Sequence, residues 1–248
     1  MNTKYIYTFG TIMTVVVALL LAGFRTATAD AAARNEDVFN KREILATVAD
    51  PLAEAGSPIG SLTDEEVLEI FNEQVEQVVV DGQGQVLGDV TVSEVDLAAE
   101  YKKPEATRRY PINIFNIDGE KYYVFSVRGN GLWDAIWGNI ALASDLNTVT
   151  GASFDHAGET PGLGAEIKDN AGWKSQFEGK KIYNGDEFVS IIVRKGGAVD
   201  PEHDVDGLSG ATVTGDGVTK MLYNGLKAYE PYISQARAGG DATSMNLK

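Results

Sequence analysis

The chain has 248 residues, no cysteine and only two histidines, and it carries 36 acidic against 21 basic side chains, for a formal charge of −15. The lack of cysteine excludes disulfides, thiolate nucleophiles and cysteine-ligated zinc or iron–sulfur centres. Two histidines argue against a multi-histidine metal site, and the acidic balance argues against binding of nucleic-acid phosphates. Any redox chemistry must therefore use an imported group.

The N-terminal segment is uncharged over residues 5–24, between Lys4 and Arg25. A helix of that length, at about 1.5 Å per residue, spans roughly the 30 Å of a bilayer core. The competing interpretation is a cleaved signal peptide, because Ala-Thr-Ala at residues 27–29 fits the small-x-small cleavage rule. The run is longer than the apolar part of a usual signal peptide, which favours a retained transmembrane anchor at residues 1–25.

The charges that flank this anchor leave its orientation open. Lys4 lies on the short side, whereas the long side carries Arg25, Arg34, Lys41 and Arg42. The positive-inside rule alone would place the body in the cytoplasm. The signal-like, N-terminal position of the segment and the small residues after it point the other way.

Residues 26–105 predict a membrane-proximal region of helices and strands. Residues 26–36 suggest a linker, and a helix is expected at residues 37–48. Thr63, with Glu66 three residues later, has the spacing of a capping box and predicts the start of another helix. Short strands are expected at 77–80 and 86–92.

Residues 106–238 predict a mixed domain. Apolar runs at 110–117 and 121–127 flank Asp118-Gly119, a hairpin signal. A C-terminal helix is expected at about residues 215–235, where apolar residues recur at helical spacing. Further strands are expected at 138–143, 148–154 and 188–194. The elements do not alternate regularly, which favours an α+β fold over a doubly wound sheet, and residues 239–248 are expected to form a flexible tail.

The strongest of three glycine-rich stretches is Asp-Gly-Leu-Ser-Gly-Ala-Thr at residues 206–212. Its Ser-Gly pair suits a tight turn, and glycine leaves the backbone open to a ligand. Thr212 lies just before the predicted C-terminal helix, where N–H groups and the helix dipole favour a phosphate. The alternative is a plain loop with Thr214 or Asp216 as the N-cap.

The second stretch is His-Ala-Gly-Glu-Thr-Pro-Gly-Leu-Gly at residues 156–164. Pro161 fixes φ and Gly162 suits a type II turn, so the stretch predicts a rigid loop that offers N–H groups to a flat polar ring or a phosphate. The alternatives are a plain turn, a surface imidazole at His156 and a solvated Glu159. One histidine and one glutamate do not make a metal site.

The third stretch, at residues 128–138, contains Trp133 and Trp137, four residues apart. That spacing is one helical turn and favours core packing or a hydrophobic staple. Lys180 follows a turn, where a cation is most often solvated.

Together these stretches resemble the FMN-binding domain family. In that family a flavin transferase esterifies the FMN phosphate onto the last threonine of Asp-x-x-Ser-Gly-Ala-Thr, which here is Thr212. With Glu-Thr-Pro-Gly-Leu-Gly at 159–164 and Gly-Leu-Trp-Asp-x-x-Trp-Gly at 131–138, the chain is similar to the C-subunit family of sodium-translocating NADH:quinone reductases. The G subunits of Rnf-type ferredoxin:NAD oxidoreductases share the first two motifs and remain the alternative.

The resemblance implies an electron-transfer subunit of a multi-subunit respiratory enzyme in the cell inner membrane. FMN would take electrons from an iron–sulfur centre and pass them to the next flavin, while sodium movement belongs to the assembled complex. The expected partners are the other subunits, the flavin transferase and the membrane, with no nucleic acid. A single-pass chain with a periplasmic soluble domain is implied, which conflicts with the count of flanking charges.

The resemblance also assigns the site. Thr212 is expected to carry FMN covalently, Trp133 or Leu163 to pack on it, and Lys180 to stabilise a reduced, anionic ring. Asp206 is expected to position the threonine or a metal during attachment, or else to cap a turn. The other expected cofactor contacts are Ser209, Gly210, Ala211, Glu159, Thr160, Gly162 and Gly164. No catalytic residue and no resident metal are expected, and an anchored scaffold domain without a cofactor is the alternative of a different class.

Overall fold

A computed structural model describes residues 3–239, which divide into two compact units between Lys41 and Arg42. The expected tail lies outside the described residues except for Gly239, which ends the last helix. The mixed α+β fold predicted from the sequence is confirmed, with an antiparallel sheet in the second unit.

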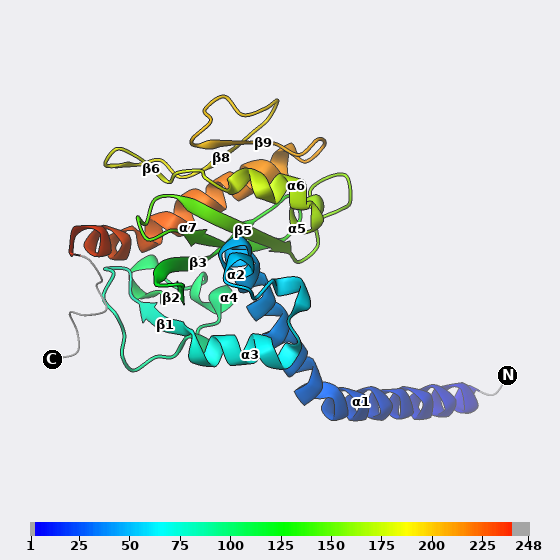
Figure 1. The fold of residues 1–248 in the computed structure, drawn as a ribbon. Coiled ribbons are helices and arrows are strands. Elements are labelled where there is room, and N and C mark those ends of the chain that lie inside the picture. Colours follow the sequence, from blue (N-terminus) through cyan, green and yellow to red (C-terminus); the bar gives the residue numbers. More distant parts are fainter. Residues whose placement is uncertain (1–2, 240–248) are drawn as a thin grey trace. The chain divides into compact units, whose positions relative to one another are not determined.

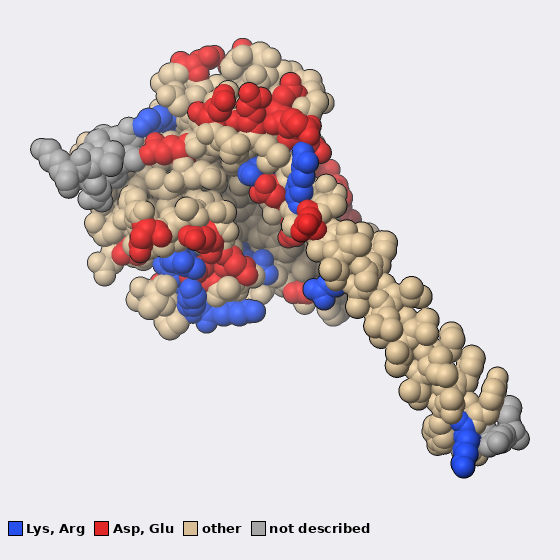
Figure 2. Space-filling model, turned by 90° about the horizontal axis from the view of Figure 1, so that it is seen from below, with Lys and Arg blue, Asp and Glu red and all other residues tan. Residues whose placement is uncertain are grey.

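The first unit is formed by helix α1 (Thr3–Leu45), whose last residues, 42–45, belong to the second unit. By length and composition α1 can cross a membrane, and its apolar stretch is a long run without red or blue side chains in Figure 2. Residues 26–36, which the sequence suggests as a linker, are helical. Alanine favours a helix there, and the Thr26 and Thr28 hydroxyls donate to the carbonyls four residues earlier.

The second unit opens with short helices. The capping box predicted at Thr63 is confirmed: its hydroxyl accepts from the Glu66 N–H at 3.3 Å, and its N–H donates to the Glu66 carboxylate at 2.7 Å. These contacts satisfy N–H groups that the helix itself cannot pair. The elements are η1 (Ala46–Val48), α2 (Ala49–Glu54), η2 (Ile59–Ser61) and α3 (Asp64–Glu73).

A five-stranded antiparallel sheet, in the order β1-β2-β3-β4-β5, forms the centre of this unit. The predicted hairpin is confirmed, because Asp118 (φ 51°) and Gly119 (φ 85°) form its two-residue turn. Positive φ at both positions matches the right-handed twist of the strands. The strands are β1 (Val75–Val80), β2 (Tyr110–Ile117), β3 (Glu120–Asn130), β4 (Ala135–Leu142) and β5 (Val149–His156).

Two predicted strands differ in the structure. Residues 86–92 make only one isolated bridge, Val80 to Val86, since Gly88 and Asp89 interrupt the apolar run. Residues 188–194 are divided by Ser190, whose φ of 62° breaks an extended chain. The short elements are η3 (Val92–Glu94), α4 (Leu97–Glu100), η4 (Glu105–Thr107), α5 (Glu166–Asp169), α6 (Ala171–Lys174), η5 (Ser175–Phe177), β6 (Tyr183–Asn184), β7 (Glu187–Phe188), β8 (Ile192–Arg194) and β9 (Asp204–Asp206).

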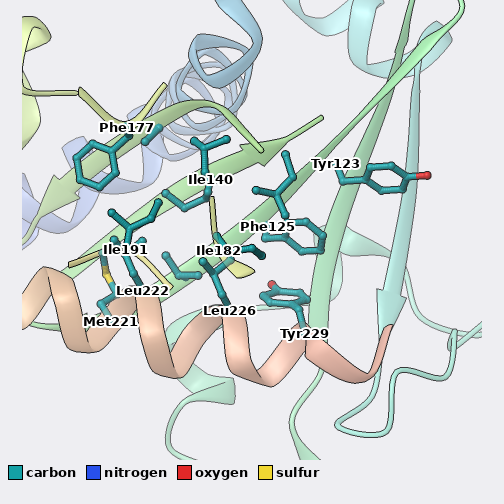
Figure 3. Packing of buried hydrophobic residues seen from close by; sticks show 14 of the residues in the cluster. Tyr123, Phe125, Ile140, Phe177, Ile182, Ile191, Met221, Leu222, Leu226 and Tyr229 are labelled. Atoms are coloured by element: carbon teal, nitrogen blue, oxygen red, sulfur yellow. The ribbon is translucent and has the colours of Figure 1, made fainter. Parts of the chain in front are cut away.

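Helix α7 (Thr212–Gly239) lies along one face of the sheet (Figure 1), in a position close to the predicted one and longer at both ends. Met221, Leu222, Leu226 and Tyr229 point from it toward the strands, where Phe125 and Ile140 lie (Figure 3). Glycines bring α7 close to β3: a Cβ on Gly217 would lie 2.4 Å from the Asn130 carbonyl oxygen. This packing fixes the first turn of α7, which begins at Thr212.

Candidate flavin site

Two of the glycine-rich stretches, and the first turn of α7 that follows the remaining one, meet at one buried carboxylate, that of Glu159. The Thr214 hydroxyl lies 2.6 Å from Glu159 Oε2 and 3.0 Å from the Leu163 carbonyl oxygen, and donates to both. Glu159 also accepts from three backbone N–H groups of the β3–β4 turn, those of Leu132 (3.2 Å), Trp133 (2.9 Å) and Asp134 (3.4 Å). One side chain therefore links the β3–β4 turn, the loop after β5 and the first turn of α7.

Glu159 is held in its charged form by these donors. Burial raises its pKa, but the hydrogen bonds from Thr214 and from the turn N–H groups outweigh burial, so the pKa lies below its usual value. The carboxylate, which the sequence assigns to the cofactor, is thus turned toward donors of the chain itself. Its backbone N–H donates to His156 Nδ1 at 3.2 Å, and the described residues contain no group of three or more residues able to hold a metal ion.

The loop after β5 packs tightly against the stretch that carries Thr212. The Leu163 N–H donates to the Thr160 carbonyl at 2.9 Å, and Gly162 has a φ of 78°, so residues 160–163 form the predicted type II turn. A Cβ on Gly210 would lie 2.4 Å from the Gly162 carbonyl oxygen, and one on Gly164 would lie 2.2 Å from the Thr214 hydroxyl. These glycines allow the two stretches to touch.

A pocket of about 540 Å³ adjoins Thr212, within the roughly 300–1,000 Å³ of small-molecule sites. Thr212 is exposed at the start of α7, where the first turn leaves N–H groups without helical partners. The neighbouring wall is open backbone, because Gly196 and Gly197 both have positive φ. The lining residues are Val193, Lys195, Gly196, Gly197, residues 206–212, Gly215 and Asp216. Ser209, Gly210 and Ala211 therefore line the same pocket as Thr212.

Asp206 fixes the turn that forms this pocket. Its Oδ1 accepts from the Ala198 N–H at 2.7 Å, and its carbonyl accepts from Trp173 Nε1 at 2.7 Å. Its own N–H donates to Gln176 Oε1 at 2.9 Å. These contacts match the turn-fixing role that the sequence leaves open for Asp206, beside the role during attachment.

Apolar side chains lie exposed on all three linked segments. Trp133, Leu163 and Val213 are 65%, 40% and 52% exposed. The helical interpretation of the Trp133–Trp137 spacing is wrong, because Trp133 lies in a turn and Trp137 lies on strand β4. The centre of the Trp137 ring is 5.3 Å from the Arg128 guanidinium carbon. The core packing expected from that spacing is not found for Trp133, which is exposed in the turn.

The structure does not place Lys180 among the lining residues of the pocket; its Nζ donates to the Pro201 carbonyl at 2.7 Å. The lysine that lines the pocket is Lys195, which the sequence reasoning did not select. Its signal is the run Lys-Gly-Gly at residues 195–197, in which a cation precedes two residues of open backbone.

Acidification is expected to destabilise the second unit through Glu159 and Asp204. Burial raises the pKa of Asp204, but hydrogen bonds from the Asp200 N–H, Arg194 and the Val199 N–H outweigh burial. The pKa of Asp204 therefore lies below its usual value. A carboxyl whose folded pKa lies below its unfolded pKa stabilises the fold above the unfolded pKa, and this contribution is lost as the pH falls through the folded pKa. The urea midpoint should therefore hold from pH 7 to about 5 and fall below about pH 4; a midpoint that rises on acidification would contradict this assignment.

Comparison with known proteins identifies the family. The profile of the FMN-binding domain family matches residues 131–227, which include Glu159, Thr212 and Thr214. The C subunit of the Na(+)-translocating NADH-quinone reductase of Pseudomonas aeruginosa is 31% identical over 256 residues, covering 92% of this chain and 94% of the relative. The C subunit from Vibrio parahaemolyticus is 39% identical over 155 residues, 60% of this chain, and the match spans 59% of that relative's length.

A solved structure agrees with these sequence matches. The crystal structure of the C subunit of the same enzyme from Parabacteroides distasonis superposes with a TM-score of 0.69 at 34% identity, covering 82% of this chain and 95% of that chain. This chain therefore belongs to the C-subunit family of Na(+)-translocating NADH-quinone reductases.

Proposed function

We propose that this chain is the FMN-carrying electron-transfer subunit of a sodium-pumping NADH:quinone oxidoreductase. The observation that supports this most strongly is Thr212: an exposed hydroxyl at the start of α7, beside a pocket of ligand size, inside the region that matches the FMN-binding domain family. The relatives favour the quinone reductase over the Rnf-type alternative, because the compared proteins carry the name of the former.

The cofactor is held through a phosphoester at Thr212. In this step the donor is a phosphoanhydride of FMN with a second nucleotide: the threonine oxygen bonds to the FMN phosphorus, the anhydride P–O bond breaks, the nucleoside monophosphate leaves, and a base of the flavin transferase accepts the hydroxyl proton. A link at the phosphate leaves the ring edge free, and FMN supplies the redox chemistry that this cysteine-free chain lacks. The residues around Thr212 bind and orient it; open backbone at Gly196 and Gly197 and the first-turn N–H groups suit a phosphate oxygen.

Lys195 is the residue we expect to balance the phosphate charge. It is the one lysine or arginine that lines the pocket in the described part of the chain, against the carboxylates Asp206 and Asp216. Lys195→Gln should slow flavin attachment about fivefold, as expected for an exposed ion pair worth up to about 1 kcal/mol. Lys195→Arg should keep the wild-type rate, and so should the matched control Lys220→Gln, an exposed lysine of α7 outside the pocket lining.

The chain is anchored to the membrane by α1. We place the soluble unit on the periplasmic side, with electrons arriving from an iron–sulfur centre of a partner subunit and leaving to the next flavin. The described chain has one helix able to span a membrane, so sodium conduction belongs to the assembled complex.

Co-expression with a flavin transferase tests the proposal. A denaturing gel under ultraviolet light should show a fluorescent band at the 26.6 kDa of this chain, and no band without the transferase. A chain that is non-fluorescent both with and without the transferase would favour the scaffold domain without a cofactor.

A further inference from the structure

Exposed apolar side chains lie on three separate segments that Glu159 and Thr214 link, and one of these segments, the first turn of α7, begins at Thr212. Trp133 lies in the β3–β4 turn, Leu163 in the loop after β5, and Val213 in the first turn of α7. Turns and loops of this kind move more than the elements they join unless other contacts hold them. The Glu159 carboxylate supplies such contacts to the β3–β4 turn and to α7.

The space around Glu159 and Thr214 is closely fitted. A Cβ on Gly131 would lie 2.6 Å from Glu159 Oε1, and one on Gly164 would lie 2.2 Å from the Thr214 hydroxyl. Glu159 is 5% exposed and Thr214 fully buried. Neither side chain lines the pocket at Thr212, so both can act on a ligand there only through the segments they hold.

We propose that Glu159 and Thr214 are positioning residues for the flavin, a proposal that rests on the function proposed above. Thr214 lies two residues after Thr212 in the same helical turn, so its bond to Glu159 fixes the attachment point relative to Trp133. The same hydroxyl contacts the Leu163 carbonyl and so fixes the attachment point relative to Leu163. The pair thereby sets where the tethered ring lies against its apolar neighbours.

Thr214→Val tests this role, because valine keeps the shape and removes the hydroxyl. In the full chain co-expressed with the transferase, we expect attachment about tenfold slower, since loss of a hydrogen bond to a charged group disturbs the geometry of the reacting hydroxyl. The visible circular dichroism of the attached flavin should also change. Thr214→Ser should restore both. Thr150→Val is the matched control, because the buried Thr150 hydroxyl on β5 has no hydrogen-bond partner.

Wild-type loading and wild-type dichroism in Thr214→Val would overturn the positioning role. If Thr214→Val does not fold, Glu159→Gln carries the same expectation, and wild-type loading in that variant would overturn it equally. A wild-type chain without flavin is a separate outcome, since it refutes the proposed function and the positioning role with it. Slow loading that Thr214→Ser fails to restore would show a purely structural effect and would also overturn the role.

Discussion

Thr212→Ala is expected to abolish covalent flavin while leaving the fold intact. The threonine oxygen is the atom that forms the ester, so its removal leaves no bond that survives denaturation. Because Thr212 is exposed, we expect the free energy of unfolding to change by no more than about 0.5 kcal/mol. The measurement is ultraviolet fluorescence of the denatured chain, with thermal unfolding of the same preparation as the check on folding.

Two neighbouring hydroxyls sharpen that experiment. Thr212→Ser keeps a hydroxyl at the same position and should retain a fluorescent band. Ser209 is exposed in the same pocket, whereas the Thr214 hydroxyl is buried against Glu159. A band that persists in Thr212→Ala and disappears in Ser209→Ala would place the ester at Ser209 and contradict the assignment.

Tyr229→Ala should produce the largest loss of stability among these substitutions. Tyr229 is buried on α7, its ring lies 4.9 Å from that of Phe125 and 5.3 Å from that of Tyr110, and its hydroxyl lies 2.9 Å from the carbonyl oxygens of Pro111 and Ser126. Truncating a buried aromatic side chain costs about 3–5 kcal/mol, because burial is lost and a cavity remains. Tyr229→Phe keeps the ring and should cost about 1–3 kcal/mol through the unpaired carbonyls.

The urea midpoint of the full chain in detergent measures both variants. Since α7 is fixed to β2 and β3 through this side chain, Tyr229→Ala should also slow flavin attachment at the far end of the helix. Equal midpoints for Tyr229→Ala and Tyr229→Phe would show that ring burial contributes little there.

Most of the elements that the sequence predicted correctly were predicted from local patterns. The capping box at Thr63, the turn at Asp118-Gly119 and the helical spacing within α7 each depend on residues a few positions apart. The strand predicted at residues 86–92 is wrong, because β propensity alone does not provide a partner strand. The linker prediction at 26–36 overlooked how well an alanine-rich stretch continues a helix.

The site depends on contacts that no local pattern contains. Glu159 and Thr214 are 55 residues apart in the chain, yet their side chains lie 2.6 Å apart. Lys180 and Lys195 look alike in sequence, and only the packing of residues 194–198 against Asp206 and Gly207 places Lys195 at the pocket. Motifs therefore predicted which stretches matter, while the division between ligand contacts and positioning contacts required the fold.

The most direct test of the flavin assignment is the mass of one peptide. Trypsin should release residues 196–220, between Lys195 and Lys220, with Thr212 inside. From the chain co-expressed with its transferase, this peptide should carry the added mass of FMN minus one water, and fragmentation should locate the addition at Thr212. An unmodified peptide, or a flavin located at another hydroxyl, would contradict the assignment.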